Sequence, residues 1–331
     1  MSNDNHRDFE PVGRPYWVVP AQEIHQAELA ESPPVTPARI QSPPPRRVWL
    51  PLLLLLATCC STMFVGSLFP SLEGIARYGP LKGLAYGLWR GFLYAGPLMT
   101  ILICHEMGHY LQARRYGVPC SLPYFIPVPI FPIGTFGAVI AMGARIGGRR
   151  ALFDIGVTGP LAGLVPTLFC CIVGLYLSDV QQVTPEIAHS AIRLGDSLLF
   201  SALSQWIHGP LPPGHDVFLH PVAMAGWVGL LITSLNLIPI GQLDGGHILY
   251  ALLRRRAAKV AMIVLLAAAV GIAYFKLWNW LLMLLLVAFM GPAHPPTAND
   301  YEPLGASRYV LGWLTLAFAT IGFTPNPFPM H

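Results

Sequence analysis

The sequence predicts an all-α polytopic membrane protein with about six to seven transmembrane helices and a re-entrant β-hairpin near a polar site. Hydrophobic residues make up 54% of the 331 residues and charged residues only 11%, whereas a soluble domain carries roughly a quarter charged residues. Several apolar runs approach the roughly 20 residues that a helix needs to cross a bilayer. A proline-rich stretch at 117–148 interrupts these runs without becoming polar. The lipid bilayer is therefore the expected environment of the chain.

Charge and cysteine usage exclude other classes of protein. The formal net charge is only +4, and arginines that flank apolar runs account for it, so no nucleic-acid partner is expected. The six cysteines form no CxxC pair, which argues against a disulfide framework or a cysteine zinc site. The first 46 residues contain several acids and no apolar run, so neither a cleavable signal nor a transit peptide is expected.

Two regions of different composition divide the chain. Residues 1–46 are rich in proline and polar groups and predict a disordered cytoplasmic tail. Residues 47–331 predict one membrane-embedded domain.

Seven apolar runs predict the membrane spans. They cover about 48–69, 89–115, 153–177, 217–239, 257–275, 277–290 and 309–323. The last two are shorter than a bilayer core requires, so they either tilt little, stop partway or form a helical hairpin.

Arginine positions predict the orientation of these spans. Most arginines lie in every second connection between the apolar runs, counting the segment before the first run as one of them. Positively charged loops usually stay in the cytoplasm. This places the N-terminus and the inner half of span 89–115 toward the cytoplasm.

Span 89–115 carries three groups that bind or use a metal. His105 and His109 stand four residues apart, so on a helix they share a face and can point at one Zn²⁺. Glu106 lies beside them, where it can take a proton from a metal-bound water. Ionisable residues inside a span indicate a functional site.

A catalytic zinc usually takes three protein ligands, so a third one is expected. Asp244 is favoured because Pro239 opens the helix before it and two glycines follow it. Asp154 is interpreted as a charge near a helix start rather than a ligand. His247 either supports a ligand or makes a structural hydrogen bond, and His294 is interpreted as a loop residue.

The stretch 134–143 has Thr, Phe, Val and Ile between spaced glycines. This pattern predicts a short hairpin. Non-helical backbone at membrane depth is tolerated only under a protein cover or beside a wet cavity. A re-entrant hairpin next to the polar site is therefore expected.

Several motifs together resemble the site-2 protease family of intramembrane zinc metalloproteases, most closely its branch without a PDZ domain. The matching pieces are His105-Glu106-Met107-Gly108-His109, Gly134-Thr135-Phe136-Gly137, the segment 151–163, and Asn236-Leu237-Ile238-Pro239 followed by Leu243-Asp244-Gly245. The resemblance covers about residues 85–300 and implies that this range is the catalytic core, located in a bacterial cell membrane in preference to a plastid membrane. It implies Zn²⁺ held by His105, His109 and Asp244. It implies Glu106 as the general base, and Asn236 as a residue that helps hold the substrate strand or the developing oxyanion.

The expected function is hydrolysis of a peptide bond in or near the transmembrane helix of single-span membrane proteins, that is, regulated intramembrane proteolysis. A metal-binding transporter is one alternative, but no internal repeat of the kind common in transporters is present. A non-catalytic scaffold is another, and the intact Glu106 argues against it. The apolar spans exclude a soluble zinc protease. The oligomeric state is left open.

Overall fold

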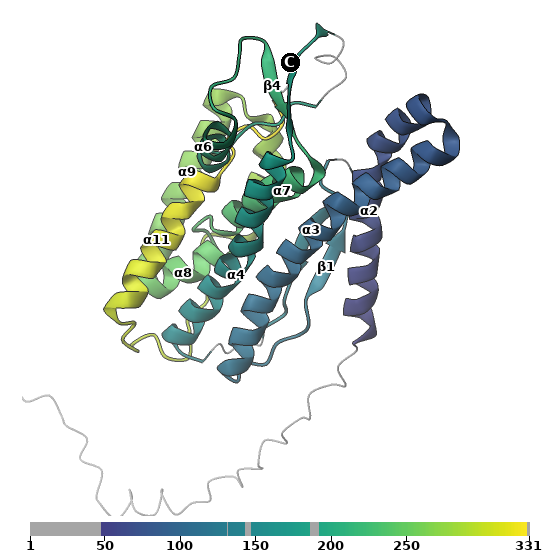
Figure 1. Ribbon diagram of the computed structural model, residues 1–331. Coiled ribbons are helices and arrows are strands. Elements are labelled where there is room, and N and C mark those ends of the chain that lie inside the picture. The colour runs from purple at the N-terminus through teal and green to yellow at the C-terminus, as the bar shows by residue number, and fades with distance from the viewer. Residues whose placement is uncertain (1–47, 131, 143–146, 186–191, 330–331) are drawn as a thin grey trace, which may run out of the picture. The chain divides into compact units, whose positions relative to one another are not determined.

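The computed structural model describes residues 48–130, 132–142, 147–185 and 192–329. The tail predicted at residues 1–46 lies outside these ranges. The described residues are mostly helical, with two short antiparallel strand pairs (Figure 1).

Helices α2 (Trp49–Tyr78) and α3 (Pro80–Arg115) form an antiparallel pair joined at Gly79, whose φ is +83°. Both are longer than the spans predicted at 48–69 and 89–115. With 30 and 36 residues they reach about 45 and 54 Å, more than a hydrocarbon core of about 30 Å. The predicted spans were too short because charged residues between them end the apolar runs. Charged side chains do not end a helix, so both helices continue past these residues.

Helices α4 (Arg149–Tyr176) and α7 (Pro221–Asn236) pack against α3. The core between them contains Leu98 and Leu102 of α3 and Trp227 of α7, all buried. This packing turns one face of α3 inward, and the histidine pair lies on that face.

The chain leaves the helical conformation after α7 and resumes it at α8 (Asp244–Leu253), as the proline and glycines between them predict. A short 3-10 turn, Arg254–Arg256, then leads into α9 (Ala257–Phe275). Arg254 has a φ of +53°, a conformation that a right-handed helix excludes. The backbone therefore breaks between α8 and α9, although the apolar sequence continues.

The described residues contain four stretches that are long and apolar enough to cross a membrane: Trp49–Tyr78, Pro80–Arg115, Arg149–Tyr176 and Asp244–Phe275. The last of these includes the break at Arg254. The other predicted spans fall on shorter helices: α7 has 16 residues, α10 (Leu281–Met290) has 10, and α11 (Ala306–Gly322) has 17. The helical membrane architecture agrees with the prediction, while six to seven complete crossings stay a prediction.

Strands β1 (Tyr124–Pro127) and β2 (Thr135–Val139) form the predicted hairpin, with Phe125 opposite Ala138. Two side chains hold its turn against α2 and α3. The Ser61 hydroxyl donates to the Gly134 carbonyl at 2.7 Å, and the Tyr94 hydroxyl donates to the Ile133 carbonyl, also at 2.7 Å. A re-entrant position in the bilayer stays a prediction.

At the other end of the helices, β3 (Asp179–Gln182) pairs with β4 (His215–Phe218). Between them lies α6 (Leu198–His208), whose first turn is capped by the Ser197 hydroxyl, which accepts from the Phe200 amide.

Candidate metal centre

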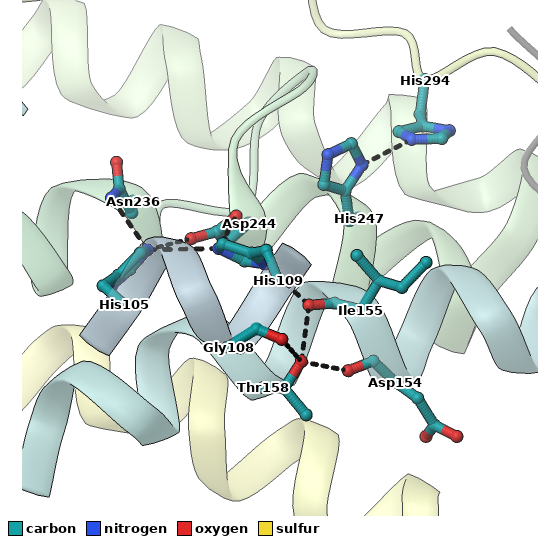
Figure 2. A network of polar contacts seen from close by, with 10 residues as sticks. All are labelled: His105, Gly108, His109, Asp154, Ile155, Thr158, Asn236, Asp244, His247 and His294. Atoms are coloured by element: carbon teal, nitrogen blue, oxygen red, sulfur yellow. Dashed lines mark hydrogen bonds and ion pairs between the residues drawn. The ribbon is translucent and has the colours of Figure 1, made fainter. Parts of the chain in front are cut away.

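His105, His109 and Asp244 meet inside the bundle (Figure 2). The two histidines lie one turn apart on α3, and Asp244 is the first residue of α8. His105 Nε2 is 3.1 Å from Asp244 Oδ2, and His109 Nε2 is 3.2 Å from Asp244 Oδ1. The two Nε2 atoms are 3.2 Å apart. Three potential ligand side chains thus converge on one point.

These distances fit a zinc ion. Tetrahedral zinc with ligand bonds of about 2.0–2.1 Å separates its ligand atoms by about 3.3 Å. Each Nε2 atom lies 3.1 to 3.2 Å from an Asp244 oxygen, and the two Nε2 atoms lie 3.2 Å apart, all within 0.2 Å of that value. Two imidazoles and one carboxylate also form a ligand set that leaves a fourth position open, as catalytic zinc sites do.

His109 is held in the tautomer that a metal ligand needs. Its Nδ1–H donates to the Ile155 carbonyl of α4 at 2.7 Å, which leaves the Nε2 lone pair free to face the cluster. Both histidine side chains are buried, His105 at 3% and His109 at 7% exposure. The sequence did not indicate Ile155, because a backbone carbonyl leaves no mark in a residue pattern.

Helix α4 can approach the histidines because it has glycines where it meets them. A Cβ at Gly159 would collide with the His109 ring, and one at Gly163 would lie 2.9 Å from the Cβ of His105. Small residues four apart are a common means of close helix packing in membranes. Both glycines lie in the segment 151–163, whose resemblance to the protease family pointed to this region but not to their role.

The loop between α7 and α8 delivers Asp244 to the histidines. Gly241 has a φ of +56°, and a Cβ on Gly245 would collide with the Leu237 carbonyl. The chain therefore turns back closely on the end of α7 before α8 begins. This tight return brings the first side chain of α8 to the same depth as the histidine pair.

The other two predicted site residues lie beside the cluster. Asn236, the last residue of α7, has its Nδ2 atom 3.4 Å from His105 Nε2. Glu106 is 6% exposed on α3. It directly follows His105 in the helix.

Asp154 is not part of the cluster, and its interpretation as a helix-start charge is wrong. Because α4 begins at Arg149, Asp154 lies beyond the first turn. Its carboxylate accepts two hydrogen bonds from Arg308, both at 2.8 Å, and one from the Tyr116 hydroxyl at 2.5 Å. Asp154 therefore links α4 to α11 and to the end of α3.

His247 and His294 also lie outside the three-ligand cluster. They are hydrogen-bonded to each other, with His247 Nδ1 2.7 Å from His294 Nε2 (Figure 2). The sequence left two interpretations open for His247, support of a ligand or a structural hydrogen bond, and gave no sign of this partner.

A buried His–His–Asp cluster next to a glutamate, on apolar helices, is a possible metal site with the ligand types that zinc hydrolases use. The family comparison agrees with this class. Residues 93–275 match the sequence signature of peptidase family M50, and the chain belongs to that family.

Curated relatives carry consistent names. The "Probable zinc metalloprotease EGY2, chloroplastic" of Arabidopsis thaliana is 30% identical over 243 residues, which cover 70% of this chain and 42% of the relative. The "Probable zinc metalloprotease EGY1, chloroplastic" of Oryza sativa subsp. japonica is 36% identical over 154 residues, or 46% of this chain and 26% of the relative. The chain thus spans less than half the length of these relatives. No solved structure matches it.

Proposed function

We propose that this protein is an intramembrane zinc metalloprotease that hydrolyses a peptide bond in or near the transmembrane helix of a membrane-protein substrate. The convergence of His105, His109 and Asp244, with the Nε2 and Oδ atoms 3.1 to 3.2 Å apart beside Glu106, carries the proposal. Membership of peptidase family M50 and the names of the relatives support it.

Each residue has a distinct role in this proposal. His105, His109 and Asp244 would hold the zinc, which when bound would lower the pKa of a water ligand toward neutrality and polarise the scissile carbonyl. Glu106 takes the proton of that water and passes it to the leaving amine. The Ile155 carbonyl fixes the orientation of the His109 ring by accepting a hydrogen bond from its Nδ1–H. Asn236 lies close enough to His105 to donate its amide to a substrate carbonyl bound at the site.

The hairpin of β1 and β2 is proposed to hold the substrate. The carbonyls of a transmembrane helix are bonded within the helix, so a substrate must unwind before it can be cut. A two-stranded pair has unpaired edges, and an extended segment can add to such an edge through main-chain hydrogen bonds. Single-span membrane proteins are the proposed substrates, since they can enter laterally from the bilayer.

The membrane and the orientation are part of the proposal. The distribution of arginines favours an N-terminus and a site on the cytoplasmic side of a bacterial membrane, or on the stromal side of a plastid membrane. The relatives carry the word chloroplastic in their names. Their names favour a plastid membrane over the bacterial membrane expected from the sequence.

The membrane proteome of cells that express the protein tests the proposal. Glu106→Gln removes the base but keeps a side chain of nearly the same shape. Single-span membrane proteins are expected to accumulate as uncut forms in cells with Glu106→Gln and not in cells with wild type. Glu73→Gln is a matched control, because Glu73 is exposed on α2 away from the cluster. Identical fragment patterns for Glu106→Gln and wild type would contradict a proteolytic function.

A further inference from the structure

The segment 291–305, which joins α10 to α11, contacts α8 through a pair of histidines. His247 lies one turn after Asp244 on α8 and is 9% exposed. Its Nδ1 atom is 2.7 Å from Nε2 of His294, and His294 Nδ1 is in turn 2.6 Å from the Pro295 carbonyl oxygen. Figure 2 shows the pair on the side of His109 that faces away from His105.

The direction of these hydrogen bonds follows from the chemistry of the groups. A carbonyl only accepts, so His294 Nδ1–H donates to Pro295. Burial lowers the pKa of His294, against the opposing effects of the Pro295 carbonyl and Asp300, so its ring is neutral at pH 7. Its Nε2 is then an acceptor, and His247 Nδ1–H donates to it. The loop backbone thus fixes His294, and His294 fixes the ring of His247.

A second contact holds the same face of α8. The His294 ring packs on the ring of Tyr250, with centroids 4.7 Å apart. The Tyr250 hydroxyl donates to Asp300 at 2.7 Å, and the other Asp300 oxygen accepts from the amide and the hydroxyl of Thr297. His247 and Tyr250, three residues apart on α8, are therefore both anchored to an internally bonded loop.

The same loop is tied to the start of α4. The Asn299 carbonyl accepts from the Arg149 amide at 3.2 Å. The Arg149 guanidinium donates to the carbonyls of Ala251 and Leu252, in the last turn of α8. The loop thus connects α4, which presents Ile155 to His109, with α8, which carries Asp244.

Helix α8 depends on such contacts for its position. It has 10 residues, and Leu243 at its N-cap provides no side-chain cap. Helices this short are marginal in isolation, so tertiary contacts determine where they lie. We infer that His294 is a positioning residue for the metal site: through His247 it fixes the first turn of α8 and with it the Asp244 carboxylate. This inference rests on the proposed zinc site.

Zinc affinity of the purified full-length protein tests the inference, with zinc alone as the probe in a competition against a chelator. His294→Leu keeps an apolar side chain of similar bulk but has no acceptor. We expect it to bind zinc several-fold more weakly, below the roughly 10- to 100-fold loss that follows removal of a group bonded directly to a ligand. His294→Gln places an acceptor near the position of Nε2 and is expected to restore most of the affinity.

Two further variants separate positioning from general damage. His215→Leu is the matched control, because His215 also contacts a neighbouring proline carbonyl, at 3.2 Å, but has no histidine partner among the described residues. Its zinc affinity should equal that of wild type. The double variant His247→Leu/His294→Leu should bind zinc no more weakly than His247→Leu alone, since His294 acts through His247.

The outcomes are distinguishable. Zinc affinity of His294→Leu equal to wild type, or equal loss in His294→Leu and His294→Gln, would overturn the inference while leaving the proposed protease intact. If His294→Leu does not fold, the comparison of His294→Gln with His294→Asn decides, because the shorter asparagine cannot reach His247. A wild-type protein that binds no zinc would overturn the proposed function itself, and the inference with it.

Discussion

Asp244 is the residue on which the metal site depends most, since it is the only acidic group that contacts both histidine rings within the described residues. Asp244→Ala removes one of three ligands and its negative charge. We expect the zinc content of the purified variant to fall sharply. Asp244→Asn, which keeps the shape, should retain an intermediate amount. Full zinc content in Asp244→Ala would mean that another group is the third ligand.

For single residues, the sequence predicts the side chains of the candidate site but not the groups that hydrogen-bond to side chains in and next to it. His105, Glu106 and His109 follow from helical spacing, and Asp244 from the helix break at Pro239. The Ile155 carbonyl could not be predicted, because every residue has one. The partner of His247 lies 47 residues away in a loop, and only the tertiary fold decides which loop covers α8.

Among the elements, α4 determines how closely the bundle closes around the histidines. Gly159→Ala would force a methyl group into the His109 ring. Such overpacking typically costs about 1–3 kcal/mol, and here it would also displace a ligand. We therefore expect lower thermal stability and a loss of bound zinc in this variant.

A second glycine provides the control for that prediction. Gly271 lies within α9, and a Cβ built on it meets nothing within 4 Å. Gly271→Ala should therefore be neutral or slightly stabilising, because alanine favours a helix over glycine. If Gly159→Ala also keeps its zinc and stability, the close approach of α4 is not required for the site.

Element boundaries could be predicted only in part. The break between α7 and α8 and the hairpin of β1 and β2 follow from prolines and glycines. The extension of α2 and α3 beyond the apolar runs could not be read from hydropathy, because charged side chains continue a helix outside the hydrocarbon core. The division of 244–275 at Arg254 was likewise hidden, since the hydropathy of the sequence continues across it.

At the scale of the whole membrane domain, arginines gather at one end of the helices. Arg149 and Arg150 begin α4, Arg254 follows α8, and Arg308 lies near the start of α11. Contacts of Arg150 with Glu302, and of Arg308 with Asp154, hold these ends together. The strand pair of β3 and β4 lies beyond the opposite end of α4. Which of these two ends faces the cytoplasm stays a prediction from the arginine positions.

Cysteine labelling with a membrane-impermeant maleimide tests this orientation. Arg115→Cys, at the end of α3, and Asp216→Cys, in β4, both replace exposed residues. In sealed vesicles of known sidedness we expect only one of the two to react, and the other to react after permeabilisation. The parent protein gives the background from its native cysteines. Labelling of both positions from the same side would contradict the predicted threading.

The combination of zinc analysis and cleavage in one purified preparation tests the central claim most directly. Wild type and Glu106→Gln would be reconstituted with a single-span membrane protein, and bound zinc and substrate fragments measured in both. The account predicts one zinc per chain in each protein and cleavage by wild type alone, because Glu106 moves the proton but does not bind the metal. Cleavage by Glu106→Gln at the wild-type rate, or a wild type that cleaves without zinc, would contradict it.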